Sequence, residues 1–247
     1  MSPPGPIEET PGTAVELVPL PGLPEIRPGV VLAPLLVEAA AAAGRPLQPG
    51  DCLVVTQKVV SKAEGRLVPL DPSDLEARRR LVESESVRIL RRRGDLIICE
   101  TSHGFVCANA GVDLSNVDDG WAALLPVDGD RSARRIRDGI RAACGVEVAV
   151  VVSDTFGRPW RHGLVDVAIG VAGLAAVVDL RGTEDDRGRA LQVTEVAVAD
   201  EVAAAAELVM GKARGIPAAL VRGLDAAWLR DSSVGELIRP TRDDLFR

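Results

Sequence analysis

The stretch VEVAVVVSDT at residues 146–155 constrains the fold more than any other part of the chain. Consecutive apolar, mostly β-branched residues indicate a strand that is buried on both faces, in the interior of a sheet. The stretch ends in three polar residues, Ser153, Asp154 and Thr155. In α/β proteins, ligand sites lie beyond the carboxyl ends of such strands. We therefore expect a sheet protein with a polar site where this strand ends.

Helix-like and strand-like segments alternate along the chain, which predicts a mixed α+β fold with a large mixed sheet and flanking helices. Helices are predicted at 29–44, 73–94, 130–145 and 194–211, with Ser73 as an N-cap and Gly44 and Gly94 as stops. Strands are predicted at 51–61, 95–101, 104–111 and 216–223, and within 164–181. Since the chain has no P-loop and no GxGxxG motif, neither a P-loop nor a Rossmann fold is expected.

The domain organisation is expected to be simple. Residues 1–14, rich in Pro and Gly, predict a flexible lead-in, and residues 15–247 a single domain, with two intertwined subdomains as the alternative. The N-terminus has neither the basic nor the apolar segment of a signal peptide. The longest apolar run, 167–178, is too short to cross a bilayer. We therefore expect a cytoplasmic protein without a membrane partner.

The cysteines agree with a reducing compartment. Cys52, Cys99, Cys107 and Cys144 are widely separated, and none belongs to a CxxC pair or has a histidine at zinc-finger spacing. We expect buried free thiols.

Overall charge excludes one class of partner. The net charge is -7 and aromatic residues make up only 2% of the chain, so a basic or base-stacking surface for nucleic acid is not expected. Local arginines and lysines could still bind a small anionic ligand, because net charge does not fix local potential.

A first polar segment, HGFVCANAGVDLSN, covers residues 103–116. Asp113 and Asn116 carry oxygen atoms of the kind that bind hard metal ions and phosphate-bearing ligands. The alternative is that both side chains only make turn or capping hydrogen bonds. His103 is expected in a turn and Cys107 in the core, so neither is a favoured ligand.

A second polar segment, VVVSDTFGRPWRHG, covers residues 150–163. Asp154 and Thr155 could bind Mg²⁺ or Mn²⁺, and Arg158 and Arg161 could bind phosphate or carboxylate. The alternative is a capping aspartate with surface arginines. His162 alone is weak evidence for a site.

A third polar segment, VVTQKVVSKAEGR, covers residues 54–66. Lysines in its second half could face a phosphate, or they could protect an edge strand from aggregation. Taken together, the residues indicate an acidic α+β protein that holds a divalent metal through Asp113 and Asp154 beside basic groups. Such a site suits phosphoryl chemistry without a P-loop.

Five ordered motifs resemble those of the coenzyme F-420-0:L-glutamate ligases, also called F-420 gamma-glutamyl ligases. They are LPGLPEIRPG, VVTQKVVSKAEGR, ETSHGFVCANAGVDLSN, VVVSDTFGRPWRHG and VTEVAVADEVAAAAELVMGKA, and the resemblance extends from about residue 15 to RPTRDDLF. It implies a homodimer of unusual mixed fold that joins L-glutamate, once or repeatedly, to coenzyme F-420-0. The reaction would use GTP, form an acyl phosphate, release GDP and phosphate, and need Mg²⁺ or Mn²⁺ and K⁺.

The resemblance also implies roles for single residues. Asp113, Asp154 and Thr155 would bind metal, and Asn116 and Gln57 would lie at the nucleotide. Two segments and a lysine would also contact GTP: Leu23, Pro24, Glu25, Ile26, Lys62, Met210, Gly211, Lys212, Ala213, Arg214, Gly215, Ile216 and Pro217. Neutralisation of the reacting anions by Lys62, Arg158 and Arg161 is our inference from charge, and His162 is a weak candidate for a general base.

One residue departs from the family pattern. Some relatives carry Gln or Glu at the position of Lys212, where it helps to hold a metal, and an ammonium group has no acceptor for that purpose. This departure puts a second metal site in doubt and keeps an alternative open, a nucleotide- and metal-binding regulatory module without ligase activity. In some bacteria a flavin-binding domain follows the ligase domain, and the sequence leaves open whether this chain comes from such a protein.

Overall fold

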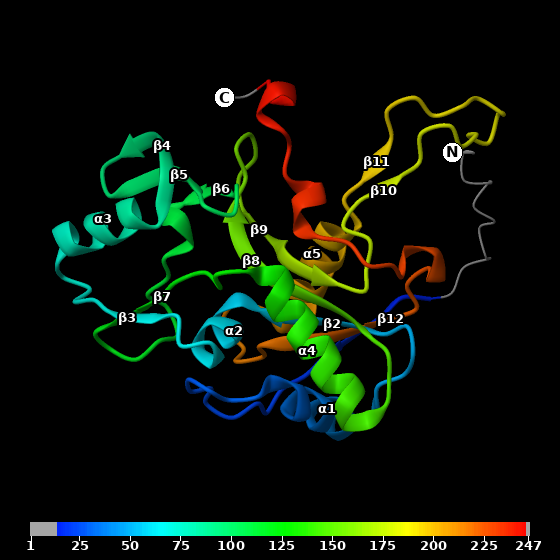
Figure 1. The fold of residues 1–247 in the computed structure, drawn as a ribbon, viewed down its shortest axis with the longest axis horizontal. Coiled ribbons are helices and arrows are strands. Elements are labelled where there is room, and N and C mark those ends of the chain that lie inside the picture. Colours follow the sequence, from blue (N-terminus) through cyan, green and yellow to red (C-terminus); the bar gives the residue numbers. More distant parts are fainter. Residues whose placement is uncertain (1–13, 246–247) are drawn as a thin grey trace.

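A five-stranded mixed sheet, in the order β1-β12-β2-β8-β9, organises the chain in the computed structural model, which describes residues 14–245 (Figure 1). Its strands are β1 (Glu16–Pro19), β12 (Ala218–Arg222), β2 (Cys52–Thr56), β8 (Ala149–Gly157) and β9 (Leu164–Ala172). β2 and β8 run parallel, and the other neighbours are antiparallel. β8, the strand predicted from VEVAVVVSDT, has a neighbour on each side, so its interior position is confirmed.

Helices cover both faces of this sheet. α1 (Leu32–Ala42) and α4 (Gly129–Cys144) pack on one face, and α5 (Val198–Met210) packs on the other (Figure 1). Side chains alternate along β8, so Val150 and Val152 join the core beneath α1 and α4, while Val151 joins the core beneath α5. The mixed α+β fold class is confirmed, and the parallel pair is too small a part of the sheet for a Rossmann fold.

α4 and β9 approach each other closely where the helix begins. A Cβ atom on Gly129 would lie 2.0 Å from the carbonyl oxygen of Ile169, and one on Gly170 would lie 2.2 Å from the backbone of Gly129. The backbones can come into contact here because both residues are glycines; any side chain at either position would block the contact.

A smaller lobe lies beside the sheet, between α2 (Gln57–Ala63) and α4 along the chain (Figure 1). It contains the pair β3 (Leu67–Pro69) and β7 (Trp121–Ala123), the helix α3 (Leu75–Ser84), and the sheet of β4 (Ser86–Arg93), β5 (Leu96–Thr101) and β6 (Val106–Ala108). Its own core includes Val82, Ile97, Cys99 and Val112. The remaining pair is β10 (Val178–Asp179) and β11 (Glu195–Val196).

Whether 15–247 is one domain or two intertwined subdomains stays a prediction. The predicted lead-in falls on residues that, apart from residue 14, lie outside the described range.

The predicted helix at 73–94 is wrong in its second half. α3 ends at Ser84, and residues 86–93 form β4, which pairs with β5 through a two-residue turn at Gly94–Asp95. Gly94, read as a helix stop, has φ +58° and belongs to that hairpin turn. The helix begins after Asp74, whose side chain accepts a hydrogen bond from the Ala77 amide, and not after Ser73. Pairing with β5 outweighs the helix propensity of the arginines.

The predicted strand at 51–61 is also too long. β2 ends at Thr56, and α2 begins at Gln57. The alternative of an edge strand protected by lysines is wrong as well, because β2 is the middle strand of the sheet and both lysines lie on the helix.

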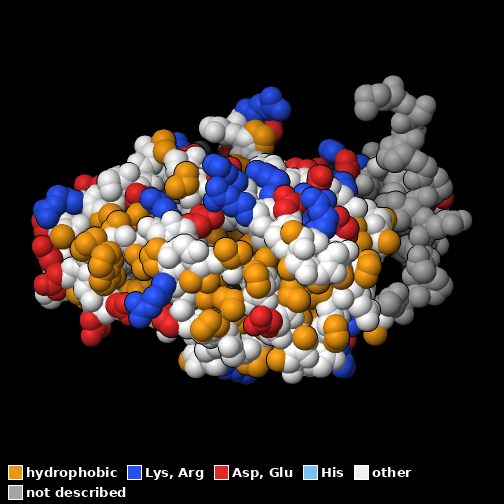
Figure 2. Space-filling model, turned by 60° about the horizontal axis from the view of Figure 1, so that its bottom comes forward, with side chains coloured by type: hydrophobic (Ala, Val, Ile, Leu, Met, Phe, Trp, Pro, Cys, Tyr) orange, Lys and Arg blue, Asp and Glu red, His pale blue; other side chains and the backbone are white. Residues whose placement is uncertain are grey.

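The cysteines are free thiols. Cys52, Cys99 and Cys107 are buried as predicted, and burial, the largest cause, raises the pKa of both Cys52 and Cys107 to about 12. Cys144 is exposed near the end of α4, so the prediction of burial is wrong there. On the face shown in Figure 2, basic side chains are interspersed with acidic and hydrophobic ones.

Candidate active site

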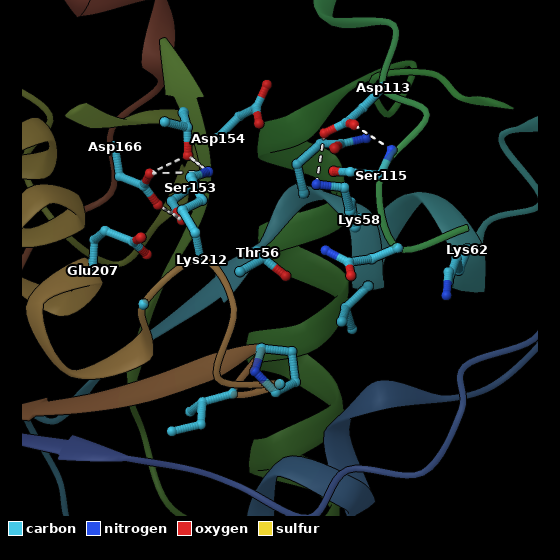
Figure 3. Close-up of a pocket in the computed structure, with 18 of the residues that line it drawn as sticks. Thr56, Lys58, Lys62, Asp113, Ser115, Ser153, Asp154, Asp166, Glu207 and Lys212 are labelled. Carbon is cyan, nitrogen blue, oxygen red and sulfur yellow. Dashed lines mark hydrogen bonds and ion pairs between the residues drawn. The ribbon is translucent and has the colours of Figure 1, made fainter. Parts of the chain in front are cut away.

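A cavity of about 830 Å³ opens where β2 and β8 end, which is where the sequence predicts a site (Figure 3). Because the two strands are parallel neighbours, their carboxyl ends bring Thr56 and Asp154 to the same side of the sheet. Most of the predicted site residues line this cavity: Leu23, Pro24, Glu25, Ile26, Gln57, Lys62, Asp113, Asn116, Asp154, Thr155, Gly211, Lys212, Ala213, Gly215, Ile216 and Pro217.

Four predicted site residues do not belong to this lining. Met210, the last residue of α5, is fully buried in the core, and Arg214 lies beside Gly211. Arg158 and Arg161 lie in the turn between β8 and β9. The positive charge in the lining therefore comes from lysines.

Eight lining residues were not among the predicted site residues: Thr56, Lys58, Val59, Ser115, Ser153, Leu164, Asp166 and Glu207. The sequence indicates that the lysines of this segment could face a phosphate, but a strand over 51–61 does not place Lys58 and Lys62 together at one site. Once 57–63 is helical, Lys58 and Lys62 are four residues apart and lie on one face. Asp166 carries no local signal, because it reaches the site only through its pairing with Thr155 across the hairpin.

α2 holds its two lysines toward the cavity because the adjacent row of side chains, Gln57 and Ser61, is anchored to the chain at Leu124. The Gln57 amide nitrogen donates to the Leu124 carbonyl at 2.9 Å, and the Ser61 hydroxyl donates to the same oxygen at 2.6 Å. Both side chains are buried. The Lys58 ammonium lies 2.6 Å from the Asp113 carboxylate, and the Lys62 ammonium lies 2.5 Å from that of Glu25.

Asp113 is fixed by its backbone and by its neighbours. It follows the tight turn Asn109–Gly111, and its amide and carbonyl pair with Ala123 at 3.0 and 2.8 Å. One carboxylate oxygen accepts from the Ser115 amide at 2.7 Å, which is the turn hydrogen bond that the alternative interpretation expected. The other oxygen faces Lys58 and the cavity (Figure 3). Burial acts to raise the pKa of this carboxyl, but the hydrogen bonds from Lys58 and Ser115 outweigh it and lower the pKa.

Asp154 lies between Asp113 and Asp166, each of which has its own group of polar side chains around it (Figure 3). Burial raises its pKa to about 6, and the charge of Asp113 adds to the rise, while the Thr155 amide and the charges of Lys58 and Lys212 oppose it. Within residues 14–245, no lysine or arginine lies in ion-pair distance of this carboxylate. A positively charged partner could therefore bind beside Asp154.

The second group surrounds Asp166, a buried carboxylate on β9. It accepts a hydrogen bond from the Ser153 hydroxyl at 3.1 Å and another from the Thr155 hydroxyl. The Lys212 ammonium donates to the Thr155 hydroxyl and lies 3.9 Å from Asp166. Since side chains alternate along a strand, Thr155 faces this group while Asp154 faces the other way. The structure thus divides the three residues predicted to bind metal between two groups.

The remaining conspicuous residues of the 103–116 segment lie where the sequence suggested. Cys107 is buried, and His103 sits after β5 with Nε2 at 2.9 Å from the Pro126 carbonyl and its ring stacked on Phe105. Across residues 14–245 there is no cluster of three or more His, Cys, Asp or Glu side chains suited to a metal. The carboxylates of Asp113 and Asp154 both belong to the cavity lining and carry hard oxygen atoms.

Fold and site together define a small-molecule-binding α+β protein. Its cavity gathers three lysines and five carboxylates at the ends of two parallel strands, without a P-loop or a dinucleotide-binding turn. Such a lining suits a polar, anionic ligand together with a hard cation. No helix within the described residues has the length and apolar character needed to cross a membrane.

Comparison with known proteins agrees with this class. Residues 22–223 match the family model described as F-420-0:gamma-glutamyl ligase, and the chain belongs to that family. It is 46% identical to the coenzyme F-420:L-glutamate ligase of Methanothermobacter thermautotrophicus, over 94% of this chain and 99% of that protein. The same-named proteins of Methanopyrus kandleri and Methanocaldococcus jannaschii are 44% and 40% identical, over 94% and 82% of this chain and 98% and 86% of theirs.

Proposed function

We propose that this protein is an enzyme, a ligase that joins L-glutamate to coenzyme F-420-0. Membership of the family and the names of relatives that align over nearly their whole length support the substrates. The observation that carries the proposal is the juxtaposition of Asp113 and Asp154 with lysines in one cavity. Forming an amide from a carboxylate and an amine requires an activated acyl group, and this cavity offers the charges that such an activation needs.

We further propose that the activating group is a phosphoryl group taken from GTP. A carboxylate of coenzyme F-420-0 would attack the terminal phosphorus and displace GDP, giving an acyl phosphate. The amine of glutamate would then attack the acyl carbon, losing a proton and displacing inorganic phosphate. In both steps anions approach each other, so positive charge from Lys58, Lys62 and Lys212 lowers the barrier.

A divalent ion, Mg²⁺ or Mn²⁺, would be held by Asp113 and Asp154. Two observations support this fit: both groups present hard oxygen atoms to the cavity, and Asp154 has no basic partner within the described residues. Two carboxylates leave most of the coordination of Mg²⁺ to water and to phosphate oxygens, as is usual at nucleotide sites. When bound, the ion would supply Lewis-acid polarisation of a phosphate.

The nucleotide would lie against two loops of the lining. The loop at 23–26 carries Glu25, which is bound to Lys62, and the loop at 211–217 follows α5. Gly211 and Gly215 have φ values of +62° and +66°, which let this backbone turn without a side chain between it and a ligand. Asn116, also with positive φ, lies on the Asp113 side of the cavity.

The test is turnover with each reactant omitted in turn. Purified protein is incubated with coenzyme F-420-0, GTP, Mn²⁺ and glutamate, and phosphate release is followed. We expect phosphate release only when both F-420-0 and glutamate are present. We also expect the rate to depend on K⁺. Sedimentation tests whether the protein is a homodimer, as we propose. Release that ignores acceptor and amine would refute the ligase proposal. Tight GTP binding without any turnover would favour the alternative, a nucleotide- and metal-binding regulatory module, whose structural basis would be the ammonium of Lys212.

A further inference from the structure

The group around Asp166 is built like a cation site. Its three oxygen-bearing side chains come from paired strands, Ser153 and Thr155 from β8 and Asp166 from β9. The carboxylate is only 3% exposed, and both hydroxyls bind it. A carboxylate and two hydroxyls are hard donors, and a buried carboxylate requires a compensating charge.

Lys212 provides that charge from outside the hairpin. It follows α5, where Gly211 with φ +62° turns the chain toward β8. Its ammonium contacts the Thr155 hydroxyl and lies 3.9 Å from Asp166, and its side chain is half exposed on the cavity side. An ammonium has three donors and no acceptor, so it can satisfy these oxygens and still donate a hydrogen bond into the cavity.

The charges around the two groups differ. Beside Asp166 lies Glu207 of α5, and the charges that face this pair are those of Lys212 and Arg214, two acids against two bases. In the group of Asp113 and Asp154, Lys58 forms an ion pair with Asp113, while Asp154 has no ion-pair partner within the described residues and the charges of Lys58 and Lys212 act on it only from beyond ion-pair distance. A divalent ion therefore gains more beside Asp113 and Asp154, where one carboxylate has no ion-pair partner, than beside Asp166, where Lys212 is already present.

We propose that Lys212 is a resident cation: its ammonium occupies a second oxygen-lined cation site formed by Asp166, Ser153 and Thr155, so that the cavity takes one divalent ion and not two. This proposal rests on the proposed function, which identifies Asp113 and Asp154 as the site of the one divalent ion. The ammonium would offer its remaining hydrogens to a phosphate of the bound ligand. Thr155, predicted as a metal ligand, then serves this ammonium instead.

The experiment counts bound Mn²⁺ by electron paramagnetic resonance in chelator-stripped protein, without nucleotide. Four proteins are compared: wild type, Lys212→Gln, Lys212→Arg, and the control Lys62→Gln, which removes an ammonium from the same cavity without touching Asp166. We expect saturation at one ion per chain for wild type, Lys212→Arg and Lys62→Gln, and at two for Lys212→Gln. Thermal melting verifies that each variant is folded, and Lys212→Met repeats the test without adding an amide oxygen.

Several outcomes would overturn the proposal. Two ions in the wild type would show that the ammonium excludes nothing. An unchanged count in both folded Lys212→Gln and Lys212→Met, whether one or none, would show that no cation site lies beneath it. Because the count needs no turnover, it separates this proposal from the proposed function: a wild type that ligates glutamate but binds two ions refutes only the resident cation. An inactive wild type with the expected counts would refute only the ligase.

Discussion

Asp154 gives the sharpest link between the geometry of the cavity and a measurable free energy. Its carboxyl is held in a site where burial and the nearby Asp113 disfavour the charged form, and its pKa rises from the ordinary value of 3.8 to about 6. The native state therefore binds more protons than the unfolded chain between these two pKa values. By linkage, this carboxyl makes the wild type lose stability as the pH rises through that window.

The magnitude follows from the pKa difference. Each pKa unit is worth about 1.4 kcal/mol, so the charged carboxylate destabilises the metal-free native state by about 3 kcal/mol above pH 6, relative to acid. Asparagine has nearly the same shape and no charge. We therefore expect Asp154→Asn to be as stable as the wild type below about pH 4 and about 2–3 kcal/mol more stable at pH 7 to 8, although the variant should have lost its ligase activity.

The assay is urea denaturation of both proteins from pH 3.5 to 8, with a chelator present. Asp113→Asn is the matched control from the same cavity, and its sign is opposite. The pKa of Asp113 is lowered by Lys58 and Ser115, so its charged form contributes stability at neutral pH that is lost as the pH falls. A pH-independent gain for Asp154→Asn, or a loss at pH 7.5, would refute the reasoning about Asp154.

Three further substitutions test the backbone contact at Gly129, the Asp51–Arg222 ion pair and the role of Lys58. Gly129→Ala should destabilise the fold by at least about 3 kcal/mol, because its Cβ would lie 2.0 Å from the carbonyl oxygen of Ile169, and a normal melting temperature would contradict that contact. Asp51→Ala should lower the free energy of unfolding, measured by urea denaturation at neutral pH, by about 3 kcal/mol. The buried carboxylate accepts hydrogen bonds from Arg222 through both oxygens, at 2.7 and 2.8 Å. A change below about 1 kcal/mol would show that the pair contributes little to stability. Lys58→Gln should bind Mn²⁺ several-fold more tightly in calorimetry, because its ammonium competes with the ion for a carboxylate, and weaker binding would mean that the lysine supports the metal site.

Much of the scaffold could be predicted because its signals are local. The run 146–155 indicated an interior strand, and its polar end indicated a site, and both the strand and a lined cavity are present there. α4 was predicted within one residue at each end, and in the structure its ends are set by the Asp128 cap and by Gly145 in the left-handed conformation. Patterns that depend on neighbours within a few residues are readable from one sequence.

The errors have a common physical cause, which is pairing between distant segments. β4 is a strand because β5 pairs with it, and α2 replaces the end of a strand because Gln57 and Ser61 find the Leu124 carbonyl more than sixty residues away. Asp166 entered the site in the same way, through the register of the β8–β9 hairpin. The position of Lys212 could be suspected from the sequence, but its partners could not.

The most direct test of the central claim is mass spectrometry of coenzyme F-420-0 after incubation with this protein, GTP, Mn²⁺ and L-glutamate. We expect F-420-0 to gain one glutamyl residue, or a series of them, with one phosphate released for each residue added. We also expect Asp154→Asn, although folded and more stable, to leave F-420-0 unchanged. Unmodified F-420-0 with the folded wild type, or full turnover by Asp154→Asn, would contradict the ligase proposal.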